Sequence, residues 1–206
     1  MAKKKRPDFL VLATKNEGKI REFKALLKGF PLKIKSLKDY PEAPEVLETG
    51  ETFFDNAFKK AYEIAKALNV LALADDSGLE VDALGGAPGV YSARYAGPKA
   101  TDEENYLKLL KELEGVPPKE RTARFRCVIV ICHPSGAWLK AEGSWEGLIT
   151  TEPRGEYGFG YDPVFLIPDL GKTAAEIPPK LKNQLSHRAN ALRELLDLLP
   201  SFLKVL

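Results

Sequence analysis

The sequence predicts an α/β fold with a mixed β-sheet flanked by helices, and two observations lead to this class. In the first half of the chain, short apolar strand patterns alternate with helical patterns, as in parallel α/β sheets. In the second half, two long strand patterns flank the turn Pro134-Ser135-Gly136, which predicts an antiparallel hairpin. A sheet that contains both kinds of pairing is mixed.

The elements are placed by the spacing of apolar residues and by start and stop signals. Helices show apolar residues on one face, and Thr52 or Asp55 and the capping box at Thr101 mark helix starts. In chain order we expect a strand at 8–13, a helix at 20–27, a strand at 32–35, a loop at 37–47, a helix reaching 68, strands at 70–74 and 79–84, a helix at 101–113, strands at 122–132, 138–149 and 163–167, and a helix from 186 to 199.

Length and composition indicate one soluble domain, residues 1–206, with a basic flexible lead at 1–7. A net charge of +2 gives no whole-chain argument for binding nucleic acid or an acidic membrane surface. No apolar stretch is long enough to span a bilayer. Cys127 and Cys132 fall at odd spacing in one strand pattern, so they cannot bridge each other, and free cysteines fit a cytoplasmic location.

Two adjacent acids, Asp75 and Asp76, follow the apolar run 70–74, which reads as a buried strand. Carboxylates at the exit of a buried strand repel each other and are partly desolvated, and a cation relieves both costs. The pair therefore predicts a metal or acid/base site. The alternative is a turn or a helix N-cap, because Asp-Ser-Gly is ordinary turn chemistry.

Residues 14–19 connect a strand to a helix, and such a turn offers backbone N–H groups and a helix dipole to a phosphate. It is not a Walker loop, because Ile20 stands where Ser or Thr should follow the lysine. An ordinary connection with a surface lysine is the alternative.

Glu48 can join the acids as a hard oxygen ligand, which favours Mg²⁺. Periodicity alone places Lys60 on a solvated helix face.

A glycine-flanked aromatic, Phe159, can lie flat against a base, and Asp162 can accept a hydrogen bond from a ring N–H. Lys182, His187 and Arg188 cluster near the start of the last helix and can donate to a carbonyl on a base edge. The alternatives are a core aromatic, a helix-start histidine and an exposed salt bridge.

These stretches together resemble the inosine triphosphate pyrophosphatase family, also called dITP/XTP pyrophosphatases. Lys15, where many members carry glycine, departs from the pattern. The matching segments occur in the family's order: residues 13–19, 48–50 with 56–57, 74–79, 85–94, 158–163 and 186–188.

The resemblance implies a two-lobed fold, shared with Maf-like proteins, with the active site in the cleft between the lobes. It implies a cytoplasmic homodimer that uses Mg²⁺ to hydrolyse non-standard purine nucleoside triphosphates (ITP, dITP, XTP), without nucleic-acid or membrane partners. Asp76 is the implied catalytic base, with Glu48, Asp75 and Asp76 at the metal. The implied substrate contacts are Thr14, Lys15, Asn16, Glu17, Gly18, Lys19, Lys60, Ser77, Phe159, Gly160, Tyr161, Asp162, Lys182, His187 and Arg188.

Two other functions fit the same residues. A Maf-like nucleotide pyrophosphatase would share the chemistry but prefer another base. A nucleotide sensor would bind purine nucleotides without hydrolysing them, although the complete set Glu48, Asp75 and Asp76 argues against it.

Overall fold

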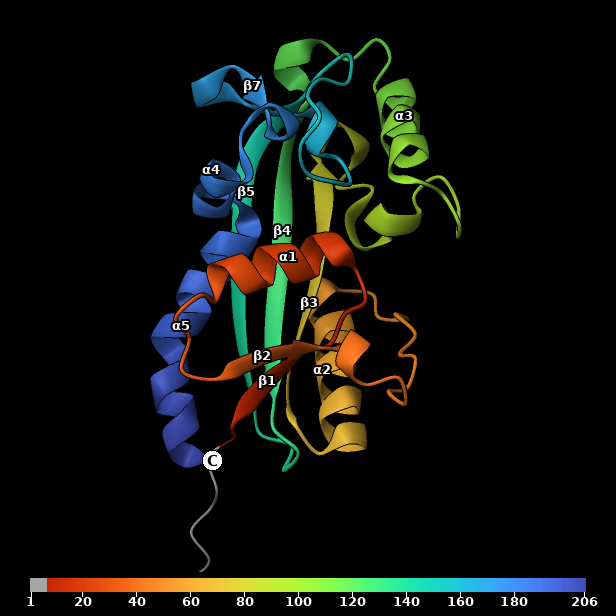
Figure 1. The fold of residues 1–206 in the computed structure, drawn as a ribbon. Coiled ribbons are helices and arrows are strands. Elements are labelled where there is room, and N and C mark those ends of the chain that lie inside the picture. Colours follow the sequence, from red (N-terminus) through yellow and green to blue (C-terminus); the bar gives the residue numbers. More distant parts are fainter. Residues whose placement is uncertain (1–6) are drawn as a thin grey trace, which may run out of the picture. The chain divides into compact units, whose positions relative to one another are not determined.

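A computed structural model describes residues 7–206, so the expected basic lead lies, apart from Pro7, outside the described residues (Figure 1). Within them the strands form one mixed sheet in the order β2-β1-β3-β4-β5-β6-β7. The chain divides into two compact units. The first contains the chain up to Asp76 with residues 128–143 and 191–206, and the second contains residues 77–127 and 144–190. The mixed α/β fold class is thus confirmed.

In the first unit, β1 (Phe9–Leu12) pairs in parallel with both β2 (Lys33–Ser36) and β3 (Leu71–Val81). Helices α1 (Glu17–Leu26) and α2 (Phe53–Leu68) follow β1 and precede β3. The aromatic rings of Phe54 and Phe58 in α2 pack 5.5 and 5.7 Å from the ring of Trp138. An apolar core with completely buried β1 residues holds the turn after β1 and the start of α2 in place.

In the second unit, β6 (Phe165–Ile167) pairs antiparallel with β5 (Trp138–Ile149) and with β7 (Lys172–Thr173). Helix α3 (Asp102–Glu112) adds apolar side chains to a core that also holds Phe125 and Phe165, whose rings are 4.4 Å apart. Phe125 belongs to β4 (Thr122–Cys132). Helix α4 (Pro179–Leu185) then leads into α5 (His187–Val205).

The acid pair lies inside a strand, not at its end. β3 continues through Asp75-Asp76-Ser77-Gly78 to Val81, so both the expected strand exit and the alternative turn are wrong. The reason is sheet pairing: β3 is hydrogen-bonded to β4, which is also 11 residues long, and this pairing outweighs the local turn preference of Asp-Ser-Gly.

Helix boundaries differ from the expected ones at three places. α1 starts at Glu17 because the Asn16 side chain caps it. α4 was not expected, and α5 continues past Pro200 to Val205. Of the two candidate caps for α2, Thr52 is the N-cap and Asp55 completes its capping box. The capping box at Thr101 and the free state of both cysteines are confirmed. None of the helices in residues 7–206 combines the length and the hydropathy needed to cross a membrane.

Candidate functional site

The turn between β1 and α1 has a defined hydrogen-bond pattern. The Asn16 Oδ1 atom accepts from the Lys19 backbone N–H at 3.0 Å, and the Asn16 N–H donates to Thr14 Oγ1 at 3.1 Å. Lys15, Asn16 and Glu17 are exposed, and Glu17 is paired with Lys38. The positive N-terminal end of the α1 dipole therefore faces solvent, and Lys19 lies in the first turn of the helix. This arrangement is suited to binding an anion.

Lysine ammonium groups hold the carboxylates of the first unit together. The Nζ atom of Lys19 lies 2.9 Å from Asp75 Oδ2. The Nζ atom of Lys60 contacts the Glu48 carboxylate, donates to the Asp75 backbone oxygen at 2.7 Å and lies 3.9 Å from Asp76 Oδ1. We call these five residues the acid–lysine cluster. Lys60 is thus a member of the site, not part of a solvated helix face.

Asn56 adds a neutral hydrogen-bonding group to this cluster. Its Nδ2 atom donates to Asp76 Oδ2 at 3.0 Å, and its Oδ1 atom accepts from the Gly50 N–H at 2.7 Å. The side chain is completely buried in the first turn of α2. Sequence reasoning missed Asn56 as a site residue, although its polarity on an otherwise apolar helix face was a usable signal.

Burial and charge shift the pKa values of the cluster in different directions. Burial raises the pKa of Asp76 to about 6, although Lys60 and Lys19 act in the opposite direction. Burial alone would lower the pKa of the Lys60 ammonium, but Glu48, Asp75 and Asp76 reverse this and raise it. Burial would raise the pKa of Glu48, but the charge and the hydrogen bond of Lys60 together with the charge of Lys19 outweigh it, and the pKa is lowered. The pKa of Asp76 therefore lies closer to neutral pH than its ordinary value, and that of Glu48 lies further from it.

The donor set of the cluster fits a hard divalent cation. Carboxylate oxygens are the ligands that Mg²⁺ prefers, and a single ammonium group already lies near both Glu48 and Asp76. In residues 7–206, however, no three His, Cys, Asp or Glu side chains are close enough together to bind one metal ion. Glu48, Asp75 and Asp76 thus have suitable chemistry, with lysine ammonium groups as their cationic partners in this conformation.

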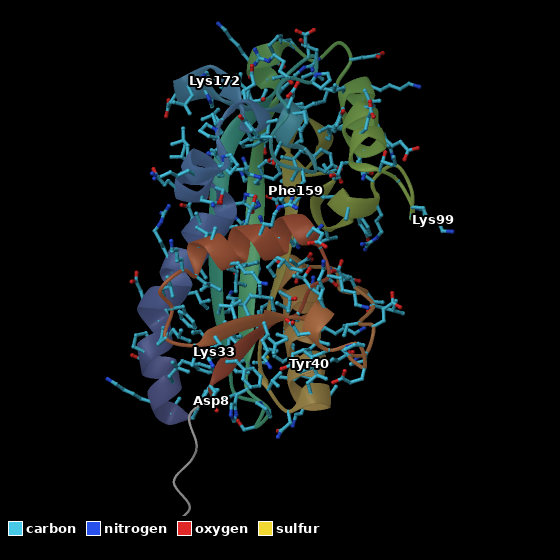
Figure 2. The ribbon with its side chains drawn as sticks, in the orientation of Figure 1. Asp8, Lys33, Tyr40, Lys99, Phe159 and Lys172 are labelled. Atoms are coloured by element: carbon cyan, nitrogen blue, oxygen red, sulfur yellow. The ribbon has the colours of Figure 1, made fainter. Side chains whose placement is uncertain are left out.

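The second unit brings Phe159 together with cationic side chains, and Figure 2 labels this ring. Lys182 Nζ lies 4.8 Å and the Arg188 guanidinium carbon 5.9 Å from its centroid. Lys182 also pairs with Asp162 Oδ2 at 2.5 Å, and Arg188 donates to Ser77 Oγ at 3.3 Å. Asp162 is buried, and it accepts the Phe159 N–H at 2.9 Å. Two cationic side chains, each with a hydrogen-bond partner of its own, therefore lie over the Phe159 ring.

Neighbouring residues fix this aromatic loop and the histidine. Asp102 accepts the Gly160 N–H at 2.7 Å, and the Tyr161 hydroxyl donates to the Ser92 carbonyl at 2.7 Å. The His187 ring stacks on Phe125, with centroids 4.7 Å apart. Sequence reasoning missed Asp102 and Phe125 because each is distant in sequence from the residue that it positions. Tyr161 is buried, so its side chain serves the loop.

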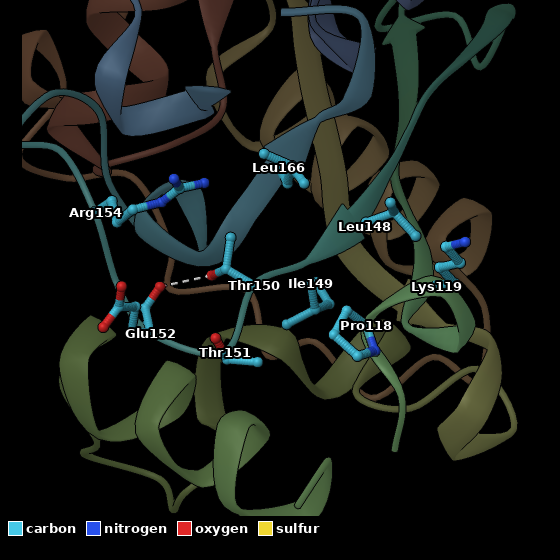
Figure 3. A pocket seen from close by; sticks show the side chains of 9 residues that line it. All are labelled: Pro118, Lys119, Leu148, Ile149, Thr150, Thr151, Glu152, Arg154 and Leu166. Carbon is cyan, nitrogen blue, oxygen red and sulfur yellow. Dashed lines mark hydrogen bonds between the residues drawn. The ribbon is translucent and has the colours of Figure 1, made fainter. Parts of the chain in front are cut away.

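A pocket of about 300 Å³ in the second unit is lined by other residues, among them Lys119, Thr150, Thr151 and Arg154 (Figure 3). Thr150 donates to the backbone carbonyl of Glu152 at 2.7 Å, and Arg154 Nε lies 3.8 Å from the Glu176 carboxylate. None of the residues that line this pocket is among the predicted site residues.

A mixed α/β fold that brings acids of β3 and of the loop before α2 together with lysines of α1 and α2 has the charges that proteins of the polyphosphate-binding class need. The chain belongs to the Ham1 family, whose profile matches residues 10–198. This confirms the resemblance seen in the sequence.

Curated relatives and solved structures agree with this assignment. A dITP/XTP pyrophosphatase of Bacillus licheniformis is 56% identical over 190 residues, which cover 92% of this chain and 97% of the relative. One from Geobacillus kaustophilus is 54% identical over 186 residues, covering 90% and 91%. A HAM1 protein from Coxiella burnetii matches with a TM-score of 0.85 and 45% identity, covering 93% of this chain and 98% of the other.

Proposed function

We propose that the protein is a nucleoside triphosphate pyrophosphatase that hydrolyses ITP, dITP and XTP to the monophosphate and pyrophosphate. Water attacks the α-phosphorus, the bond from this phosphorus to the oxygen bridging the β-phosphate breaks, and pyrophosphate leaves. The observation that carries the proposal is the acid–lysine cluster, which combines carboxylates with two cations that can bind a triphosphate. The names of the curated relatives support the same activity.

Asp76 is the proposed general base. Its pKa of about 6 leaves it ionised at neutral pH while keeping it basic enough to take a proton from the attacking water. Asn56 binds one of its oxygens, and the other faces Lys60 at 3.9 Å. The carboxylate is therefore held in a fixed orientation before substrate binds.

We further propose, from the family resemblance and the chemistry of the acids, that the reaction depends on Mg²⁺. Glu48, Asp75 and Asp76 would supply its ligands, although in this conformation the three side chains do not lie close enough together to bind one ion. When bound, it would supply positive charge and polarise phosphate oxygens. The chain's own contribution to phosphate binding is Lys19, Lys60 and the capped N-terminus of α1 from Thr14 to Lys19. These groups would neutralise the triphosphate so that a water molecule can approach it.

The second unit is proposed to select the base. Phe159 would stack on the purine, and Lys182, His187 and Arg188 would donate to the carbonyl at C6 of hypoxanthine or xanthine. Adenine carries an amino group there, which would leave these donors unpaired, and such mispairing discriminates strongly. The pairing of Asp162 with Lys182 supports a further role for Asp162 in orienting this lysine.

We also propose, from the family resemblance, that the chain acts as a single domain in a cytoplasmic homodimer. Light scattering coupled to size-exclusion chromatography would test the dimer, with a particle of twice the chain mass of 22.8 kDa as the expected result. A monomer at micromolar concentration would contradict it.

Pyrophosphate release from ITP, dITP, XTP, GTP and ATP, with and without Mg²⁺, tests the function. We expect release from the first three, little from ATP and GTP, and none with EDTA. Asp76→Asn should lower kcat on ITP by about 10²–10⁴-fold, because it removes the general base. Full activity of this variant would refute the role of Asp76. If the wild-type protein prefers a nucleotide with another base, it is a Maf-like enzyme. If it binds ITP without hydrolysing it, it is a nucleotide sensor.

A further inference from the structure

We infer that Asn56 is a positioning residue that holds the Asp76 carboxylate and the loop carrying Glu48 in one arrangement. This inference rests on the proposed function of the acid–lysine cluster. The first observation is the position of Asn56 in α2. The other buried residues of this helix are apolar: Phe53, Ala57, Ala61, Ile64 and Ala65. A buried amide is costly unless it is hydrogen-bonded, and asparagine is a poor helix former.

The NH₂ group and the oxygen of the Asn56 side-chain amide each make a hydrogen bond, and only one of the two amide orientations allows both bonds. The Nδ2 atom donates to Asp76 Oδ2 at 3.0 Å, while Oδ1 accepts from the Gly50 N–H at 2.7 Å. A rotated amide would place its oxygen against the carboxylate and its NH₂ group against the N–H group. The amide therefore ties the strand residue Asp76 to the loop at Gly50 through one rigid planar group.

The loop approaches Asn56 too closely for any residue except glycine at position 50. A Cβ atom there would lie 2.6 Å from Asp55 Cβ and 2.8 Å from Asn56 Oδ1. Glu48, two residues earlier, pairs with Lys60. The contact between Gly50 and Asn56 thus fixes the part of the loop that carries the Glu48 carboxylate.

Asn56 donates a hydrogen bond to Asp76 without carrying a charge, and this affects how basic the Asp76 carboxylate is. A lysine in its place would put a further full positive charge on Asp76 and make it a weaker base. An amide fixes the rotation of the carboxylate, and its effect on the charge is smaller. The structure thus separates orientation, which Asn56 supplies, from charge balance, which Lys60 supplies.

The test compares Asn56→Leu and Asn56→Asp with a matched control, Asn105→Leu. Asn105 is also a buried helix asparagine that binds a loop, with Oδ1 accepting the Ala96 N–H at 2.8 Å and Nδ2 donating to the Ala93 carbonyl at 3.3 Å. Both of these hydrogen bonds join Asn105 to backbone groups, and neither involves a carboxylate. Unfolding by urea and steady-state pyrophosphate release from ITP would be measured for each protein.

We expect both Asn56 variants to lower kcat about 100-fold while KM for ITP changes less than threefold, because misplaced groups slow the chemical step. Asn105→Leu should lose comparable stability but keep kcat within threefold. Asn56→Asp keeps the acceptor for Gly50 and nearly the same shape, so it remains informative if Asn56→Leu fails to fold. Because it also places a second carboxylate beside Asp76, its kcat is measured across pH: loss of the donor lowers kcat at every pH, whereas charge repulsion alone only shifts the profile to higher pH.

An Asn56→Asp enzyme with at least half the wild-type kcat would overturn the inference, and so would an equal loss of kcat in Asn105→Leu. A wild-type protein that releases no pyrophosphate from any purine triphosphate would instead refute the proposed function. The two failures are therefore distinguishable.

Discussion

Asp76 is buried, and its proposed role as general base requires the ionised carboxylate. The pKa of Asp76 is about 6, against an ordinary value of 3.8. The carboxyl group of Asp76 therefore holds its proton more tightly in the folded protein than in the unfolded chain. The metal-free protein therefore loses stability as the pH rises from about 4 to about 6, by up to roughly 3 kcal/mol.

Asp76→Asn removes this ionisation, and we expect it to stabilise the metal-free protein at pH 8. Its gain in the free energy of unfolding should shrink toward zero below pH 4, where Asp76 is protonated in both states. Urea unfolding with EDTA at pH 8 and pH 4 would measure it, with Asp169→Asn, at an exposed position, as the control. A gain of the same size at both pH values would contradict the assigned pKa.

Gly158 shows why the aromatic loop needs glycine. It has a φ of +79°, and a Cβ atom there would overlap the Asp162 carboxylate, which holds Lys182 and the Phe159 N–H. Gly158→Ala should raise KM for ITP at least tenfold, because it displaces groups proposed to bind the base.

Gly171→Ala is the matched control, since Gly171 also has a positive φ of 62° but a Cβ atom added there would meet nothing within 4 Å. Both variants should lose stability from the backbone conformation. Only Gly158→Ala should change KM, and an equal rise of KM in the two variants would count against the clash with Asp162.

At the scale of elements, α2 supplies Lys60 to the acid–lysine cluster and Asn56 as the hydrogen-bond partner of Asp76. A capping box at Thr52 and Asp55 starts this helix. Thr52→Ala should lower the free energy of unfolding by about 1 kcal/mol, as is usual for loss of a cap. Because fraying would loosen the first turn, kcat on ITP should fall as well.

Thr101→Ala removes the equivalent capping box from α3, which contributes nothing to the cluster. It should cost similar stability with little change in kcat. Fraying there would loosen Asp102, which holds the Gly160 N–H of the aromatic loop, so its effect on ITP turnover is expected in KM. Urea unfolding and pyrophosphate release would be measured for both variants, and matching losses of kcat would show that the effect is one of general stability.

Elements with strong local signals were predictable from the sequence. The caps at Thr52 and Thr101, the apolar run before Asp75 and the hairpin around Pro134 depend on neighbours along the chain. The continuation of β3 through Asp75-Asp76-Ser77-Gly78 was not predictable in this way. It depends on pairing with β4, more than 40 residues away, and local turn chemistry indicated the opposite.

The candidate site divides in the same manner. The anion-binding turn at residues 14–19, the acid pair and the group around Phe159 could be proposed from residue types in short motifs, and the family resemblance added Lys60 as a phosphate contact. The contacts of Asn56 with Asp76 and of Phe125 with His187 could not, because each joins residues 20 or more positions apart. The spacing of apolar residues predicts which face of a helix is buried. It does not predict which group a buried polar side chain contacts.

At the scale of the whole molecule, the division into two units has a consequence for engineering. The boundaries fall after Asp76, Cys127, Gly143 and Asn190, so neither unit is a continuous piece of the chain. A single gene truncation cannot deliver either unit intact. A chimera that takes one complete unit from a relative needs four splice junctions, three of them inside β-strands and one inside a helix.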